Sequence, residues 1–237
     1  SMTFSEAKAL FESQQLPLCE THYRQFQIYL ETLVETNRYM NLTAITDPAE
    51  VWAKHFLDSA MLLRQISVPL GGSVLDVGTG AGFPGMVIAI LRPDLRVTLL
   101  DSLQKRVTFL EETAAALGVS QQVTCIHSRA EDAAKLPRYR EQFDLVPARA
   151  VAELPVLTEY CLPFAAVGGV FAAMKGPSEH AGHAEAAAEI LGGDQPEEIS
   201  YCLDAVGERR IIRIRKRAAT PEKYPRRSDK IKKNPLQ

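Results

Sequence analysis

Two overlapping glycine patterns occupy the stretch "VLDVGTGAGFPG". Gly80, Gly82 and Gly85 satisfy G-x-G-x-x-G, the spacing of dinucleotide-binding turns. Asp76, Gly78, Gly80 and Gly82 satisfy D-x-G-x-G-x-G, a spacing typical of turns that hold S-adenosylmethionine. In both patterns the absence of Cβ atoms lets the backbone approach a ligand. The stretch therefore predicts a nucleoside cofactor at the end of a strand, and it leaves two cofactors open.

Three further features favour the methyl donor. Asp76, at the end of the first predicted strand, suits a positively charged sulfonium and amino group better than a pyrophosphate. Asp101 ends the pattern "RVTLLD", where an acid holds ribose hydroxyls, and "SRAED" at 128–132 follows the third strand, where adenine would lie. A terminal hairpin is the third feature. Together they favour an S-adenosylmethionine-dependent methyltransferase; the alternatives are an NAD-dependent oxidoreductase and a non-catalytic RNA-binding protein.

The elements that position these residues alternate between strand and helix patterns, which is typical of parallel strands joined by right-handed crossovers. The predicted strands are 73–78, 96–101, 122–127, 143–148 and 168–176, and the predicted helices are 84–92, 103–118, 153–163 and 178–191. Residues 197–205 and 208–216 predict an antiparallel hairpin. The expected fold is an α/β, Rossmann-like class I methyltransferase fold: a mostly parallel seven-stranded sheet with a C-terminal hairpin.

The patterns divide the chain into an N-terminal helical extension (1–70), the methyltransferase domain (71–217) and a basic C-terminal arm (218–237). The N-terminal helices have too little apolar surface for a separate domain, so we expect them to pack on the sheet. Asp47 is predicted to cap the third helix, with Pro48 at its first position. After Lys216 the apolar periodicity stops and three prolines follow, which predicts an extended arm.

The composition is ordinary for a globular protein, with 46% apolar and 24% charged residues. The chain has no signal-peptide pattern and no apolar run long enough for a membrane span, so we expect a cytoplasmic protein. Separately, we expect a monomer. The four cysteines are scattered and predict reduced thiols. His180 and His183 form an isolated H-x-x-H, for which we expect a solvated helix and no metal site.

Charge is distributed unevenly, although the formal net charge is only −2. From Arg209 to the C-terminus there are 12 Lys and Arg against 2 acidic residues, whereas residues 1–208 carry 15 against 27. Such asymmetry indicates a polyanionic partner, attracted by electrostatics and counterion release. A tail that only increases solubility is the alternative.

Seven stretches together resemble the bacterial glucose-inhibited-division protein B family of small-subunit ribosomal RNA methyltransferases. They are "NLTAITDPAEVWAKHFLDS", "LDVGTGAGFPG", "LLDSLQKRVTFL", "SRAED", "ARAVAEL", "MKG" and "TPEKYPRR", and they span nearly the whole chain. The resemblance implies transfer of a methyl group from S-adenosylmethionine to N7 of a guanine in 16S ribosomal RNA, namely guanine 527 in a loop of the decoding region. The implied partner is 16S RNA or the 30S subunit.

The resemblance also implies roles for individual residues. The expected cofactor-binding residues are Gly78, Gly80, Gly82, Phe83, Asp101, Ala130, Glu131 and Arg149. Ala130 and Glu131 would lie near the adenine, Asp101 would hold the ribose, and Arg149 would reach the donor or the target as the catalytic residue. The chain departs from the family pattern before Arg149, where Pro147 and Ala148 replace an expected small hydroxyl residue.

Methylation of guanine N7 needs no general base, because this ring nitrogen has an in-plane lone pair and no proton; catalysis would depend on alignment and electrostatics. The expected RNA contacts are His55, Lys105, Arg106, Lys175, Arg226 and Arg227. An equal alternative for His55 and Asp58 is a buried hydrogen-bonded pair that fastens the N-terminal helices, and for Lys175 a solvated strand end. We expect removal of residues 218–237 to weaken RNA binding and to leave donor affinity intact.

Overall fold

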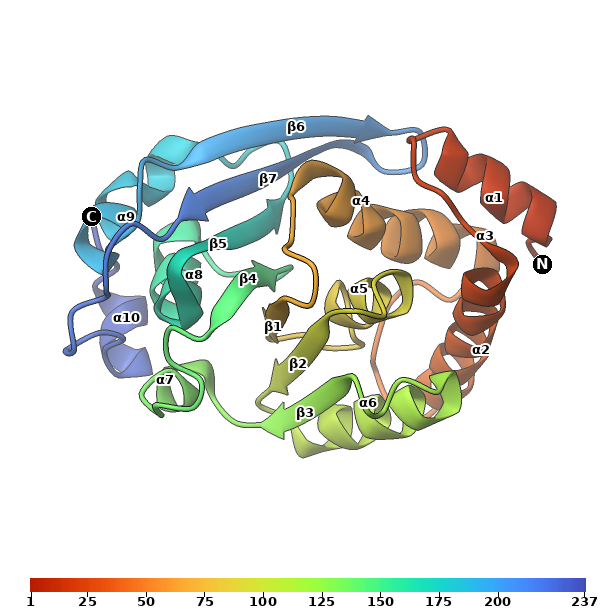
Figure 1. The fold of residues 1–237 in the computed structure, drawn as a ribbon, viewed down its shortest axis with the longest axis horizontal. Helices are drawn as coiled ribbons and strands as arrows, with labels where there is room; N and C mark the ends of the chain where they lie inside the picture. Colours follow the sequence, from red (N-terminus) through yellow and green to blue (C-terminus); the bar gives the residue numbers. More distant parts are fainter.

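The computed structural model describes residues 1–237, and the alternating elements build one seven-stranded sheet (Figure 1). The strands are β1 (Ser73–Val77), β2 (Arg96–Asp101), β3 (Val123–His127), β4 (Phe143–Ala148), β5 (Ala165–Lys175), β6 (Glu197–Leu203) and β7 (Gly207–Arg215). Their order in the sheet is β3-β2-β1-β4-β5-β7-β6. Every predicted strand is present, with ends that differ from the prediction by at most three residues.

The first five strands run parallel, and the only reversed strand is β7, which is antiparallel to both β5 and β6. The strand order changes direction at β1, which pairs with β2 on one side and β4 on the other. Ligands of open α/β sheets bind beyond the carboxyl ends of the strands at such a point. The predicted fold class is confirmed, and Gly78, Asp101 and Arg149 lie at this end of their strands.

Helices cover both faces of the sheet, as its buried parallel strands require. One face packs against α4 (Asp58–Gln65), α5 (Gly85–Leu91) and α6 (Gln104–Leu117). The other packs against α7 (Ala130–Ala133), α8 (Leu154–Cys161), the short 3₁₀ turns η2 (Leu162–Phe164) and η3 (Ala181–Ala184), and α9 (Glu185–Leu191). None of the helices is both long enough and apolar enough to span a bilayer.

The N-terminal helices share the core of the sheet domain. α1 (Phe4–Glu12) packs on α2 (Glu20–Asn37), and α2 in turn packs on α5 and α6. Then α3 (Pro48–Val51), the π-helix η1 (Trp52–Leu57) and α4 follow one another without a break. Asp47 caps α3 as predicted, because its carboxylate accepts a hydrogen bond from the Glu50 N–H at 3.2 Å. In this group α4 packs on α5, and the π-helix is a feature that the sequence pattern did not predict.

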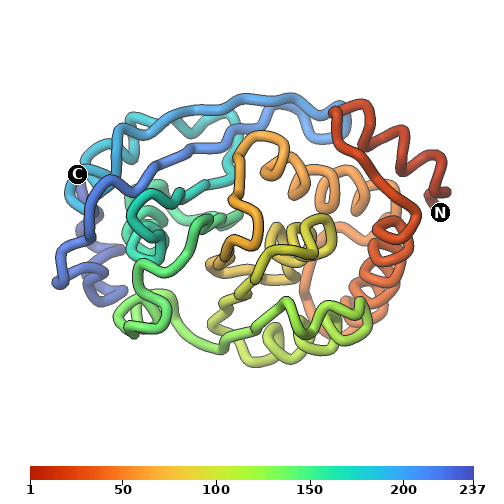
Figure 2. Tube along the Cα trace, in the orientation of Figure 1, coloured from red at the N-terminus to blue at the C-terminus, as the bar shows by residue number.

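The C-terminal segment, residues 217–237, is docked on the protein, so the prediction of an extended arm is wrong. Figure 2 shows it folded back at the end of the molecule opposite the N-terminus. It contains α10 (Ser228–Lys233), which packs on α8 through the fully buried Ile231. Arg226 pairs with the buried carboxylate of Glu159 at 2.7 Å. Ile231 and Arg226 are isolated positions in the segment and produce no apolar periodicity. The sequence pattern therefore did not predict that the segment docks.

Candidate functional site

A buried aspartate organises the glycine turn between β1 and α5. Oδ2 of Asp76 accepts hydrogen bonds from the Thr79 hydroxyl (2.8 Å) and the Gly85 backbone N–H (2.7 Å). Full burial raises the pKa of Asp76 to about 8. Its Oδ1 is buried and has no hydrogen-bond partner. Asp76 therefore shapes the turn from inside, and one of its buried carboxyl oxygens has no hydrogen-bond partner.

The glycines of the turn have different roles. Gly78 and Gly80 have positive φ angles of 66° and 59°, and nothing lies within 4 Å of the position a Cβ would take. A Cβ on Gly82 would instead collide with the Tyr29 hydroxyl, which donates a hydrogen bond to the Ala81 carbonyl at 2.5 Å. A ligand can thus approach Gly78 and Gly80, whereas Gly82 allows α2 to approach the turn.

Asp101 ends β2 and ties the turn to the neighbouring strand. Its nearly buried carboxylate accepts hydrogen bonds from the backbone N–H groups of Gly80 (2.9 Å) and Leu103 (3.0 Å). The Arg106 guanidinium lies 3.7 Å from Oδ1. The carboxylate predicted to hold a ribose therefore lies beside the open backbone of the turn.

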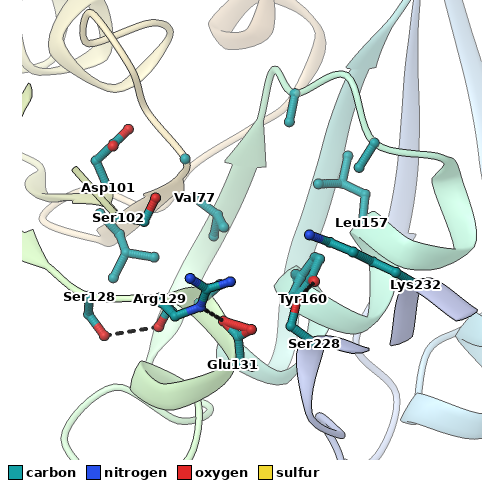
Figure 3. Close-up of a pocket in the computed structure, with 15 residues that line it drawn as sticks. Val77, Asp101, Ser102, Ser128, Arg129, Glu131, Leu157, Tyr160, Ser228 and Lys232 are labelled. Carbon is teal, nitrogen blue, oxygen red and sulfur yellow. Dashed lines mark hydrogen bonds and ion pairs between the residues drawn. The ribbon is translucent and has the colours of Figure 1, made fainter. Parts of the chain in front are cut away.

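A cavity of about 230 Å³, the glycine-turn cavity, opens beyond the carboxyl ends of the strands (Figure 3). It is lined by residues from the ends of β1 to β4, from α8 and from α10: Val77, Gly78, Leu100, Asp101, Ser102, Ser128, Arg129, Ala130, Glu131, Ala150, Ala152, Leu157, Tyr160, Ser228 and Lys232. The cavity thus brings together four residues predicted to bind the cofactor: Gly78, Asp101, Ala130 and Glu131. Nothing in the local sequence marked its walls from α8 and α10.

Phe83 and Arg149 do not line the glycine-turn cavity, although both were expected at the cofactor. The Phe83 ring is nearly buried and stacks between Tyr29 and His55, with ring centroids 5.3 Å and 4.4 Å away. The Arg149 guanidinium lies over the same ring at 5.8 Å from its centroid. Phe83 therefore joins the turn to the N-terminal helices and supports Arg149.

Arg149 follows β4 and is held by the N-terminal helices. Its Nη2 donates hydrogen bonds to the Lys54 carbonyl (3.0 Å) and to Nδ1 of His55 (3.0 Å). Its Nη1 is buried and has no partner. Pro147 and Ala148, where the chain departs from the expected pattern, are buried within β4. Arg149 is thus fixed on one side and keeps free N–H donors on the other.

His55 is buried in its neutral form. Because the guanidinium of Arg149 can only donate, Nδ1 of His55 accepts, and its Nε2 donates to the Thr43 hydroxyl at 2.8 Å. Burial, and secondarily the positive charge of Arg149, lowers the pKa of His55 to about 3. A buried neutral ring with both nitrogens engaged does not fit the predicted RNA contact. His55 instead positions Arg149.

Asp58 fastens the N-terminal helices to the terminal hairpin. Its buried carboxylate accepts hydrogen bonds from the Tyr201 hydroxyl (2.8 Å) and from Nε and Nη2 of Arg209 (3.3 Å each). Nε of Arg149 lies 4.0 Å away. The expected hydrogen-bonded pair of His55 and Asp58 is wrong, because no bond joins the two side chains. Asp58 alone fastens these helices to the hairpin, and His55 contacts Arg149.

A second cavity of about 470 Å³, the Arg149 cavity, lies at the ends of β4 and β5. Its charged lining residues are Lys54, Asp58, Arg149, Lys175, Glu179 and Arg209. Ala150 lines both cavities. Ala150 belongs to the loop that follows Arg149, which we call the dividing loop because both cavities border it.

Lys175 holds this dividing loop. Its Nζ donates hydrogen bonds to the carbonyls of Ala150 (2.9 Å) and Ala152 (2.6 Å). The residue is only 6% exposed, and burial lowers the pKa of its ammonium group. This arrangement fits neither the predicted RNA contact nor a solvated strand end. Lys175 is a positioning residue for the loop between the cavities.

Most cations of the basic C-terminal part are paired within the protein. Seven of the 12 Lys and Arg from position 209 onward form ion pairs with carboxylates: Arg209, Arg210, Arg213, Lys216, Arg217, Arg226 and Arg227. Of the residues predicted to contact RNA, Arg226 forms an ion pair with Glu159, whereas Lys105 and Arg227 are exposed. Internal pairing thus explains much of the charge asymmetry that had indicated a polyanionic partner.

Comparison with known proteins gives a family match over most of the chain. A family model described as GidB, rRNA small subunit methyltransferase G, matches residues 22–210. Ribosomal RNA small subunit methyltransferase G from Pelotomaculum thermopropionicum is 49% identical over 222 residues, which cover 92% of this chain and 92% of that protein. The protein of the same name from Symbiobacterium thermophilum is 52% identical over 218 residues, which cover 88% of each chain.

Solved structures share the fold at much lower identity. The crystal structure of an S-adenosylmethionine-dependent O-methyltransferase from Thermotoga maritima matches with a TM-score of 0.53 at 15% identity, covering 77% of this chain and 71% of that one. This likeness agrees with the strand order and shows the fold alone. The family model and the two relatives go further: the chain belongs to the GidB family, the rRNA small subunit methyltransferases G.

Proposed function

We propose that the protein transfers a methyl group from S-adenosylmethionine to N7 of a guanine in 16S ribosomal RNA. Membership of the GidB family supports a methyltransferase acting on small-subunit ribosomal RNA. The observation that carries the proposal is the pair of cavities that meet at Ala150, one beside the open glycine turn and one beside Arg149. Donor and acceptor would occupy separate cavities and meet at the dividing loop.

The glycine-turn cavity has the groups that S-adenosylmethionine requires. The backbone at Gly78 and Gly80 is open to a ligand, and the Asp101 carboxylate lies where ribose hydroxyls would bind. Asp76 is buried beneath the turn and does not line the cavity, and its carboxylate would attract the positive end of the donor through the turn. When bound, S-adenosylmethionine supplies an electrophilic methyl group on a sulfonium. A cation at this position would also lower the pKa of Asp76 and favour its carboxylate form.

Arg149 would orient the guanine without removing a proton. Guanine presents O6 and N7 as neighbouring acceptors. One N–H donor on O6, from the unpartnered Nη1, would leave the lone pair of N7 free to attack the methyl group. His55 cannot compete as a base, because its lone pair already accepts from Arg149. Acceleration would thus come from alignment and from fixed dipoles around a migrating positive charge.

The target base must leave a helical stack to reach this site. N7 faces the deep, narrow major groove of A-form RNA, which side chains enter poorly, so we expect a base in a loop or one turned out of its stack. Lys105 is exposed and has no ion-pair partner, so its charge is available to phosphates. Arg106 and Arg227 pair with Asp101 and Asp229, but their guanidinium groups remain accessible. The other three predicted RNA contacts are engaged within the protein and would position other residues: His55, Lys175 and Arg226.

The test is methyl transfer from labelled S-adenosylmethionine to 30S subunits, to protein-free 16S RNA and to tRNA, followed by mapping of the modified base. We expect 7-methylguanosine at one position of 16S RNA, with guanine 527 as the position that the family resemblance implies. Label in tRNA alone, or at a pyrimidine, would overturn the proposal. Calorimetry with S-adenosylhomocysteine and with NAD tests the donor separately, because only the former should bind stoichiometrically.

A further inference from the structure

The C-terminal segment forms one wall of the glycine-turn cavity. Ser228 and Lys232, both on α10, line the cavity together with Tyr160 of α8. Figure 3 shows the Lys232 side chain extending from α10 past Tyr160 toward the strand ends. Across the cavity lie Asp101 and Ser102. A segment expected to contact RNA therefore reaches the site expected to bind the methyl donor.

Charge-assisted and hydroxyl hydrogen bonds fix this wall to α8. Glu159 is completely buried and accepts from the Arg226 backbone N–H (2.7 Å) and from its guanidinium (2.7 Å). The Tyr160 and Ser228 hydroxyls are 2.6 Å apart and form the next hydrogen bond along α8. Adjacent residues of α8 thus hold adjacent parts of the segment. A buried, hydrogen-bonded charge pair is costly to break by removal of one partner.

A second set of contacts holds the approach to α10. The Arg140 guanidinium donates to three backbone carbonyls, those of Thr220 (3.0 Å), Pro221 (3.1 Å) and Tyr224 (2.8 Å). Beyond α10, Leu236 packs in the same apolar cluster as α8. Contacts therefore hold the segment before, within and after α10. They fix the position of α10 and hence of Lys232 at the cavity.

The position of the wall indicates which end of the donor it would contact. A crevice of about 250 Å³ is lined on one side by Arg129 and Glu131 and on the other by residues 226–229, so the segment runs beside the turn that follows β3. In the proposed function this turn contacts the adenine. The ammonium group of Lys232 and the hydroxyl of Ser228 are hydrogen-bond donors, and an adenosine offers ring nitrogens and ribose oxygens as acceptors.

We propose that residues 217–237 are part of the donor site, and that Ser228 and Lys232 bind the adenosine end of S-adenosylmethionine. The inference rests on the proposed function, because it assigns the donor to the glycine-turn cavity. It changes the expected effect of losing the segment: donor affinity should fall directly, and not only RNA affinity. It also gives Arg226 and Arg140 the role of positioning residues for a donor-binding wall.

Point variants test this and leave the buried Arg226–Glu159 anchor intact; Lys232→Met also leaves the Tyr160–Ser228 hydrogen bond in place. Calorimetry compares wild type, Lys232→Met, Ser228→Ala and the control Lys233→Met, an exposed lysine of the same helix that lines neither cavity. The probes are S-adenosylhomocysteine and 5′-methylthioadenosine, which lacks the amino-acid part. Each variant loses one hydrogen bond to the probe. We therefore expect Lys232→Met to raise the Kd of both probes about fivefold to tenfold, and Ser228→Ala to raise it about threefold. Lys233→Met should leave both unchanged.

The outcomes separate this inference from the proposed function. Unchanged Kd values in Lys232→Met and Ser228→Ala, with wild type binding S-adenosylhomocysteine normally, would overturn the donor-binding wall and leave the proposed function standing. Weaker binding of S-adenosylhomocysteine alone would overturn the placement at the adenosine end. Absence of binding by wild type would instead count against the proposed function. Melting temperatures of the variants show whether each one is folded.

Discussion

The glycine-turn cavity and the Arg149 cavity lie at the same end of the sheet, and their walls are built differently. The first is formed by open backbone at Gly78 and by the carboxylates of Asp101 and Glu131. The second is formed largely by side chains, with Arg149 and Arg209 near the buried Asp58. The first cavity also contains the cations of Arg129 and Lys232, so its charges are balanced, which suits a nucleoside. The second has four cations against two carboxylates, which suits a base on a negatively charged strand.

The two cavities also differ in which elements supply their central residues. The glycine-turn cavity is centred on turns that directly follow β1, β2 and β3. The Arg149 cavity depends on His55 and Asp58 from the N-terminal helices and on Arg209 from the hairpin. The parallel sheet thus supplies the centre of the first cavity by its topology, and the C-terminal segment adds a wall at Ser228 and Lys232. The N-terminal helices and the hairpin complete the second cavity.

The largest expected effect separates the two cavities. Arg149→Ala removes the donors of the Arg149 cavity and should lower the rate of methyl transfer about 10²-fold to 10³-fold, a loss typical of a fixed donor in an active site. The Kd for S-adenosylhomocysteine, measured by calorimetry, should change less than about threefold. Arg149→Lys is the matched control, because it keeps the charge and loses the planar fork. Normal turnover in Arg149→Ala would refute the assignment.

The converse effect is expected at the glycine-turn cavity. Asp101→Asn keeps the shape of the side chain and removes its negative charge. In wild type the carboxylate accepts a hydrogen bond from the Gly80 N–H, and we expect it to bind the ribose hydroxyls. The Kd for S-adenosylhomocysteine should rise about tenfold, as for loss of a hydrogen bond to a charged group. The rate at saturating donor should stay close to that of wild type. A lower rate at saturation with unchanged Kd would show that the two cavities are not separable in this way.

An intermediate effect on both cavities is expected at the dividing loop. Lys175→Met leaves the carbonyls of Ala150 and Ala152 without their donor, which should cost about 1–3 kcal/mol of unfolding free energy. Donor Kd should rise and the rate should fall, each about threefold to tenfold. Lys105→Met, at an exposed lysine, is the control and should leave donor Kd unchanged. If Lys175→Met changes neither quantity, the loop does not divide the two sites.

The smallest effect concerns the pH dependence of stability. The pKa of His55 is about 3 in the folded protein, below its ordinary value of 6.5, so the unfolded chain binds the proton first between these values. The stability that neutral His55 contributes is present above pH 6.5 and is lost as the pH falls. His55→Asn cannot be protonated, so its melting temperature should drop about 4–8 °C less than that of wild type between pH 7 and pH 5. Equal drops would mean that His55 is protonated at little cost.

Much of the glycine-turn cavity could be predicted from the sequence, because its residues carry local signals. A strand that runs into glycines predicts the turn at Gly78, and an acid at the end of the next strand predicts Asp101. Ala130 and Glu131 followed from resemblance, and they do line the cavity. Phe83 and Gly82 were also expected there, but they pack toward α2, because a motif marks which residues matter without showing which neighbour they face.

The contacts of Arg149 and of the C-terminal segment could not be predicted in the same way. Arg149 and His55 are 94 positions apart, and no spacing rule connects them. The segment appeared basic and aperiodic, yet Arg226 inserts its guanidinium beside the buried Glu159, 67 positions away. Ion pairs across such distances neutralise charges that a composition count treats as free.

The sequence by itself determined the strand and helix order, the glycine turn and the acid of the next strand, since these depend on periodicities and spacings within a few residues. The tertiary structure alone decided that Lys175 holds a loop, that His55 supports Arg149, and that the basic segment closes a cavity. The physical reason is that burial and pairing are set by what surrounds a side chain. The residue type of a lysine or histidine does not show whether its side chain is exposed or buried. Tertiary packing determines this, and with it the charge and role of the side chain.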